Sequence, residues 1–266
     1  MSSIALRPLA FGEVLDQSFG LYRKLFPSLF IVSLLSSGIP SLLMIVSNTR
    51  GGVIGAPVLW GSALLLSLVG GAIATASSTY LVSGYLLGRP LTTGEALSRA
   101  LPKIWPLILC SLAFGLVVGL GFLLLIVPGV IAAAGLILAF TALTVEDLTA
   151  PGALGRSWEL TKGFKGKIFG LLFVVGMILY IIMIGIGVVL GIGFALGGRG
   201  EMAPVTPGGP LPPFFIALSV ATSVLQIVVY PLLYCVLVTA YYDLRVRKEG
   251  FDLELLATTM EQPARR

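Results

Sequence analysis

The chain of 266 residues is 57% hydrophobic and only 11% charged, and its mean hydropathy is +1.03. About a quarter of the residues in a soluble globular domain are charged, so this composition excludes a soluble protein and predicts an integral membrane protein. The net charge of +5 does not indicate nucleic acid as a partner, because the basic residues lie between apolar runs, where they set orientation in the membrane.

Six runs that lack Asp, Glu, Lys and Arg predict six transmembrane helices. Each crossing needs ~20 residues, so residues 1–266 accommodate a single all-α membrane domain, a polytopic helical bundle. We expect a kink at Pro40, a weak point at Gly70–Gly71, and a tight hairpin turn at Pro128–Gly129, since proline and glycine interrupt helices. The predicted spans are 26–47, 58–87, 104–127, 129–145, 168–196 and 214–242.

Three short amphipathic segments precede apolar hairpins, at 11–24, 91–104 and 151–162. In the second segment, Thr92 and Glu95 have the spacing of a capping box. Each segment either lies in the headgroup region with its apolar side down or packs on neighbouring spans, and the two arrangements are compatible.

The recurrence of these units predicts three parallel repeats, at 11–88, 92–146 and 151–248. Their unequal spacing leaves chance resemblance between amphipathic helices as the alternative.

The distribution of basic residues predicts the orientation. Of the 17 Lys and Arg residues, 15 lie in the N-terminus, the second and fourth loops and the C-terminus. Under the positive-inside rule, both termini and all three amphipathic segments are cytoplasmic, which indicates a multi-pass protein of the cytoplasmic (inner) membrane. The Gly/Pro-rich segment 197–213 is then a flexible extracytoplasmic loop.

The sequence offers little for catalysis. It has no histidine, which removes the usual general base and the commonest metal ligand. Cys110 and Cys235 lie within apolar runs, which predicts free buried thiols. We therefore predict no catalytic residue, no metal site and no cofactor. In the glycine-rich fifth span, the spacing of Gly187 and Gly191 would permit close contact between helices.

Polar and charged residues give three groups of candidate sites. Acidic residues at the cytoplasmic edge predict ion pairs between interfacial helices, with Glu13 or Asp16 paired to Arg156 or Arg245. Polar residues of the last span either line a pathway or bond across helices; they are Thr222, Ser223, Gln226, Tyr230 and Tyr234. Basic residues at the same edge either bind lipid headgroups or a partner, or only fix topology; they are Arg23, Lys24, Arg99, Lys103, Arg156, Lys162, Lys165, Lys167, Arg245, Arg247 and Lys248.

Three stretches together resemble the bacterial membrane-protein family named for the membrane domain of glycerophosphoryl diester phosphodiesterases. They are LRPLAFGEVLDQSFGLYRKLFPSLF, TVEDLTAPGALGRSWELTKG and YYDLRVRKEGFDLELLA. The resemblance implies a six-helix domain with interfacial helices, sometimes fused to a hydrolase. That hydrolase requires histidines and a carboxylate metal site, so the resemblance does not carry its activity over to this chain.

Together these features favour a non-enzymatic membrane protein that organises phospholipids or partner proteins, which include other membrane proteins or a second copy of the chain. The alternatives are a transport or permeation component with a pathway along the last span, and a lipid-modifying enzyme. The absence of charged residues within the spans counts against coupled transport.

Overall fold

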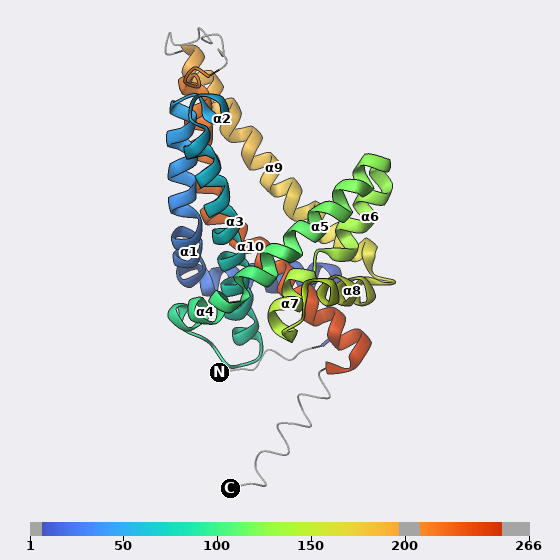
Figure 1. Cartoon of the computed structure of the whole chain (residues 1–266). Coiled ribbons are helices and arrows are strands. Elements are labelled where there is room, and N and C mark those ends of the chain that lie inside the picture. Colours follow the sequence, from blue (N-terminus) through green and yellow to red (C-terminus); the bar gives the residue numbers. More distant parts are fainter. Residues whose placement is uncertain (1–6, 197–207, 252–266) are drawn as a thin grey trace.

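The computed structural model describes residues 7–196 and 208–251, and every regular element in this part of the chain is a helix. Six helical stretches within it are long and apolar enough to cross a membrane, which confirms the predicted all-α bundle. In Figure 1, three long helices, α1, α3 and α10, form one column, and the short α2 connects α1 to α3. Their bounds are α1 Phe11–Thr49, α2 Gly52–Gly55, α3 Pro57–Leu86 and α10 Pro213–Glu249.

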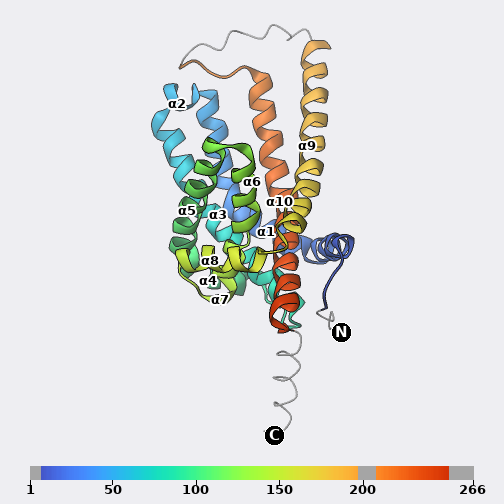
Figure 2. The ribbon, with the colours of Figure 1, turned by 90° about the vertical axis from the view of Figure 1, so that its right-hand side faces the viewer.

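The middle of the chain forms a second arm. Helices α5 and α6 pack as a hairpin that leans away from the column, and α9 runs obliquely from the base of this arm to the far end of α10 (Figures 1 and 2). The elements of this part are α4 Thr93–Ala100, the 3-10 helix η1 Leu101–Lys103, α5 Ile104–Leu124, α6 Ile126–Leu136, α7 Ala139–Glu146, α8 Ala150–Thr161 and α9 Lys165–Leu196.

The three amphipathic segments lie at one end of the molecule. The first part of α1 runs across this end, and α4, α8 and the C-terminal part of α10 lie at the same level (Figures 1 and 2). We call it the charged end. Each of these three amphipathic segments is followed by two apolar helical stretches, in the predicted order, while a relation between the three units stays a prediction. The predicted capping box is confirmed, since the backbone N–H of Thr92 donates to Glu95 over 2.8 Å.

Helix α1 joins the amphipathic segment and the first span without interruption. It changes direction as it leaves the charged end (Figure 1). Pro27 lies between the amphipathic and apolar parts and removes one helical hydrogen bond, which accounts for a bend there. Pro40 lies farther along the same helix, where the sequence predicts the kink.

The α5–α6 hairpin turns earlier than the sequence predicts. The turn lies at Leu125, which is extended (φ −163°, ψ 155°), and not at Pro128–Gly129. Pro128 instead occupies the first turn of α6, where a helix has no partner for its N–H groups and proline is tolerated. Gly129 gives room for the facing limb, because a Cβ there would lie 2.4 Å from the ring of Phe122.

The second span does not break at Gly70–Gly71, since α3 is uninterrupted. Gly70 instead allows α1 and α3 to touch, because its Cβ would lie 2.0 Å from the carbonyl oxygen of Ser36. In α9, a Cβ at Gly187 or Gly191 would meet nothing within 4 Å. Among the described residues, glycine therefore permits close contact between α1 and α3 and between α5 and α6, but not at Gly187 and Gly191 of α9.

Tight packing is concentrated at the charged end. Tyr241 and Tyr242 of α10 are among the largest fully buried side chains. Helix α9, in contrast, is buried only near its start, and its apolar side chains beyond Val175 are mostly exposed. Such a surface suits contact with lipid acyl chains. The predicted loop 197–213 lies mostly outside the described residues; Leu211, at its end, donates its N–H to the carbonyl oxygen of Asn48 over 3.1 Å.

Candidate functional site

A carboxylate at the charged end joins three helices. Glu146, the last residue of α7, pairs with Arg156 of α8, with Arg156 Nε 2.8 Å from Glu146 Oε2. The hydroxyl of Tyr241, from α10, donates to the same carboxylate. Arg156 also reaches Glu249, the last residue of α10, with Nη1 2.5 Å from Oε1. Hydrogen bonds to Glu249, and to a smaller extent to Glu146, raise the pKa of the Arg156 guanidinium above its usual value. The contacts of Glu146, Arg156 and Glu249 thus connect α7, α8 and α10.

A second carboxylate, that of Asp243 in α10, is only 1% exposed. It accepts hydrogen bonds from the backbone N–H of Leu9 over 2.7 Å and from Lys167 Nζ over 2.6 Å. Arg247, one turn later in α10, lies 3.1 Å away. Asp243 therefore attaches both the segment before α1 and the start of α9 to α10.

The predicted pairing of Glu13 or Asp16 with Arg156 or Arg245 is wrong. Glu13 accepts from the N–H of Ala10 over 2.7 Å and pairs with Arg7 over 2.6 Å. Asp16 is exposed and forms no ion pair with a described residue. The backbone N–H of Ala10, the N-cap residue of α1, is a closer donor for Glu13 than any cation of α8 or α10. Arg156 and Arg245 instead share the acids at the ends of α7 and α10.

Most of the predicted headgroup cations bond within the protein. Lys248 Nζ donates to the carbonyl oxygen of Glu159 over 2.5 Å, and Lys165 Nζ lies 2.9 Å from the ring centroid of Trp158. Lys24 lies more loosely over Tyr85. The cations in ion pairs are Lys103, Arg156, Lys167, Arg245 and Arg247. Among the described residues, Arg23, Arg99 and Lys162 form neither an ion pair nor one of these other contacts.

An open pocket of about 560 Å³ lies at the charged end, between α3, α4, the start of α5 and the α7–α8 connection. Arg99 and Lys103 supply two positive charges to its wall. Asp147 is the one acidic residue that lines it; it pairs with Lys103, but its own side chain is 78% exposed. The remaining lining residues are Tyr80, Pro102, Pro106, Leu148 and Thr149.

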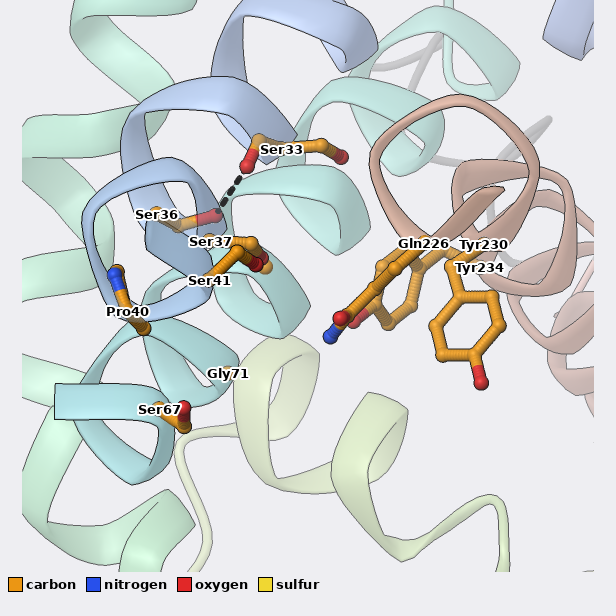
Figure 3. A pocket seen from close by; sticks show the side chains of 11 residues that line it. Ser33, Ser36, Ser37, Pro40, Ser41, Ser67, Gly71, Gln226, Tyr230 and Tyr234 are labelled. Atoms are coloured by element: carbon orange, nitrogen blue, oxygen red, sulfur yellow. Dashed lines mark hydrogen bonds between the residues drawn. The ribbon is translucent and has the colours of Figure 1, made fainter. Parts of the chain in front are cut away.

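A smaller recess of about 60 Å³ lies midway along the spans, among α1, α3 and α10 (Figure 3). Three of the five predicted polar residues of the last span line it: Gln226, Tyr230 and Tyr234. Thr222 and Ser223 do not line it; their hydroxyls donate to the carbonyl oxygen of Ser219. The other lining residues are Ser33, Ser36, Ser37, Pro40, Ser41, Ser67, Gly71 and Ala74.

The α1 serines were missed by the sequence analysis, although their spacing of three to four residues places them on one helix face. Serine in a helix usually bonds to its own backbone, and Ser36 does so, donating to the carbonyl oxygen of Val32 over 2.7 Å. The spacing alone therefore could not distinguish serines that line a cavity from serines that only bond to the backbone of their own helix.

The recess adjoins another cavity, of about 230 Å³, that faces α5. The two share Ser67, Gly71 and Tyr234. The walls that belong only to the second cavity are largely apolar, with two hydroxyls; they are Leu68, Ala72, Thr75, Leu107, Ile108, Ser111 and Phe140. Cys110 and Cys235 line neither cavity and are buried free cysteines.

Residues 56–244 match a family described as a domain of unknown function, DUF7847. The chain belongs to this family. No curated protein and no solved structure matches the chain. The matched region contains every residue that lines the open pocket, whereas the α1 serines of the recess precede it. The resemblance to the phosphodiesterase membrane-domain family stays a prediction.

Proposed function

We propose that this protein is a non-enzymatic multi-pass protein of the cytoplasmic membrane that binds anionic phospholipids on the cytoplasmic side. The observation that carries the proposal is the open pocket at the charged end, with Arg99 and Lys103 in its wall. Its volume suits a glycerophosphate group, and a guanidinium binds phosphate oxygens through paired N–H donors.

The contacts around the pocket favour an anion. Arg99 has no acidic partner among the described residues, so its charge is available. In the pair between Lys103 and Asp147 the carboxylate side chain is 78% exposed, although the lysine side chain is only 16% exposed, so the acid returns readily to water. A phosphate can therefore replace the Asp147 carboxylate at Lys103 at little cost. Trp105, two residues after Lys103, is 68% exposed and suits an interfacial anchor.

The distribution of charge supports the side of the membrane. The basic residues cluster at the end where α4 and α8 lie, whereas Arg50 is at the opposite end, between α1 and α2. Cytoplasmic leaflets carry the anionic lipids, and each basic residue near them contributes about 1 kcal/mol. The same surface could hold a partner protein, but the many internal ion pairs leave few free cations outside the pocket.

Permeation along α10 is a second candidate, and the recess beside Gln226 favours it. A cavity of about 60 Å³ holds only a few water molecules. The geometry therefore supports a binding recess better than a conduit.

The proposal is tested by native mass spectrometry of the purified chain with dioleoyl phosphatidylglycerol or dioleoyl phosphatidylcholine. We expect the wild type to bind the anionic lipid at least about tenfold more tightly, a difference of 1.4 kcal/mol. The double variant Arg99→Gln/Lys103→Gln should lose this preference, while Arg50→Gln, which removes one positive charge at the other end, should keep it. Equal binding of both lipids by the wild type, or an undiminished preference in the double variant, would reject the proposal.

A further inference from the structure

The recess among α1, α3 and α10 has features that binding at the charged end does not use. It lies near the middle of the spans, since Gly71 is halfway along α3 and Ser36 is well inside the apolar part of α1. Buried Ser33 and Ser36 form its floor, while Ser67, Gly71 and Gln226 at its edges are exposed. The recess therefore opens sideways, toward the region that acyl chains occupy.

Polar side chains at this opening lack partners. The amide of Gln226 and the hydroxyl of Tyr230 form no hydrogen bond with another described residue, and Tyr230 is 42% exposed. An amide or hydroxyl placed in hydrocarbon without a hydrogen bond is costly. Figure 3 shows both side chains on the opposite side of the recess from the serines of α1. A ligand with a donor and an acceptor would satisfy both walls.

The charge of the lining limits the chemistry of that ligand. Neither the recess nor the adjoining cavity is lined by Asp, Glu, Lys or Arg. A phosphate or an ammonium group at this depth would be desolvated with no opposite charge beside it, which is strongly unfavourable. A hydroxyl group, by contrast, both donates and accepts, as serine, tyrosine and glutamine side chains require.

The adjoining cavity provides space for a hydrocarbon chain. It continues from Ser67, Gly71 and Tyr234 toward apolar side chains of α3 and α5. Beyond it, Leu112 and Leu116 of α5 are exposed along the same helix. A chain attached to a hydroxyl group in the recess would leave along this apolar path into the bilayer.

We infer that the recess is a binding site for an uncharged lipid alcohol, such as a diacylglycerol, with its free hydroxyl among the serines and Gln226. This site is separate from the open pocket at the charged end, because the two share no lining residue.

The test uses 1,2-dioleoylglycerol and the full chain in detergent micelles, with bound lipid counted by native mass spectrometry. Gly71→Leu fills the recess, since a Cβ at Gly71 meets nothing within 4 Å, and Gly61→Leu is the matched control on the same helix. We expect Gly71→Leu to weaken binding at least about tenfold and Gly61→Leu to leave it unchanged. Dioleoyl phosphatidic acid, which has the same chains and a phosphate, should be insensitive to Gly71→Leu.

A second variant, Gln226→Leu/Tyr230→Phe, removes the unpartnered polar groups without adding bulk in the recess, and should also weaken dioleoylglycerol binding by about tenfold. The inference fails if the wild type does not bind dioleoylglycerol, or if neither Gly71→Leu nor the polar variant weakens binding. It also fails if liposomes that contain the wild type leak a small solute and Gly71→Leu stops the leak without affecting dioleoylglycerol, because the recess would then be part of a conduit.

Discussion

Arg156 and Glu146 face each other in a two-pronged ion pair, in which Nε lies 2.8 Å from Oε2 and Nη2 lies 2.9 Å from Oε1. Both side chains are less than a quarter exposed. Because Tyr241 and Arg245 approach the same carboxylate, the position of α8 against α7 and α10 depends on this acid.

Loss of either partner should destabilise the protein by about 2 kcal/mol, since each single change leaves a partly buried charge without its partner. We expect Glu146→Gln and Arg156→Gln each to lower the free energy of unfolding by this amount in detergent micelles. The double variant should lose less than the sum, because the two residues share one interaction. Simple additivity of the two effects would show that the pair contributes nothing.

Substitution of Asp243 should destabilise the protein more than substitution of an exposed acidic residue. Its carboxylate accepts from Leu9 and Lys167, and the Lys167 side chain is only 15% exposed. Asp243→Ala leaves that ammonium group buried and unpaired, a change that costs about 3 kcal/mol. The unfolding temperature of Asp243→Ala should therefore lie well below that of Asp16→Ala, which removes an exposed carboxylate. Similar unfolding temperatures for the two variants would contradict the role assigned to Asp243.

Local chemistry made much of this architecture predictable. The spans follow from charge-free runs, and the capping box of α4 follows from Thr92 and Glu95, which are three residues apart. The turn at Leu125 did not follow, because it lies within a run of leucines that has no polar or glycine signal. Proline pointed to a position three residues later, where it fits the first turn of α6 equally well.

Long-range partners were the least predictable part. The sequence placed the charges at one end, but the choice between Glu13 and Glu249 as a partner for Arg156 depends on how α8 and α10 pack. The recess was half predicted, through Gln226, Tyr230 and Tyr234 on one face of the last span. Its other wall on α1 required the crossing of two helices, which no spacing within one helix reveals.

Orientation gives a prediction independent of ligands. Ser98 of α4 is exposed at the charged end, and Thr49 is exposed at the opposite end of α1. Because Cys110 and Cys235 are buried, single cysteines at these positions should dominate labelling. A membrane-impermeant maleimide should label Thr49→Cys in intact cells and Ser98→Cys only after permeabilisation. Labelling of Ser98→Cys in intact cells would show that the orientation is the reverse of the proposed one and that the open pocket at the charged end faces the outer leaflet.

Two adjacent glycines of α3 provide the sharpest test of the packing. A Cβ at Gly70 would lie 2.0 Å from the carbonyl oxygen of Ser36, a backbone atom that cannot rotate away, so Gly70→Ala must separate α1 from α3. Overpacking of this kind costs about 2 kcal/mol. At Gly71 the same substitution meets open space, and replacing glycine by alanine in a helix interior contributes about 0.5–1 kcal/mol of stability. Unfolding in detergent micelles should therefore show opposite signs for the two variants, and a stable Gly70→Ala protein would mean that α1 and α3 are not in contact at Ser36.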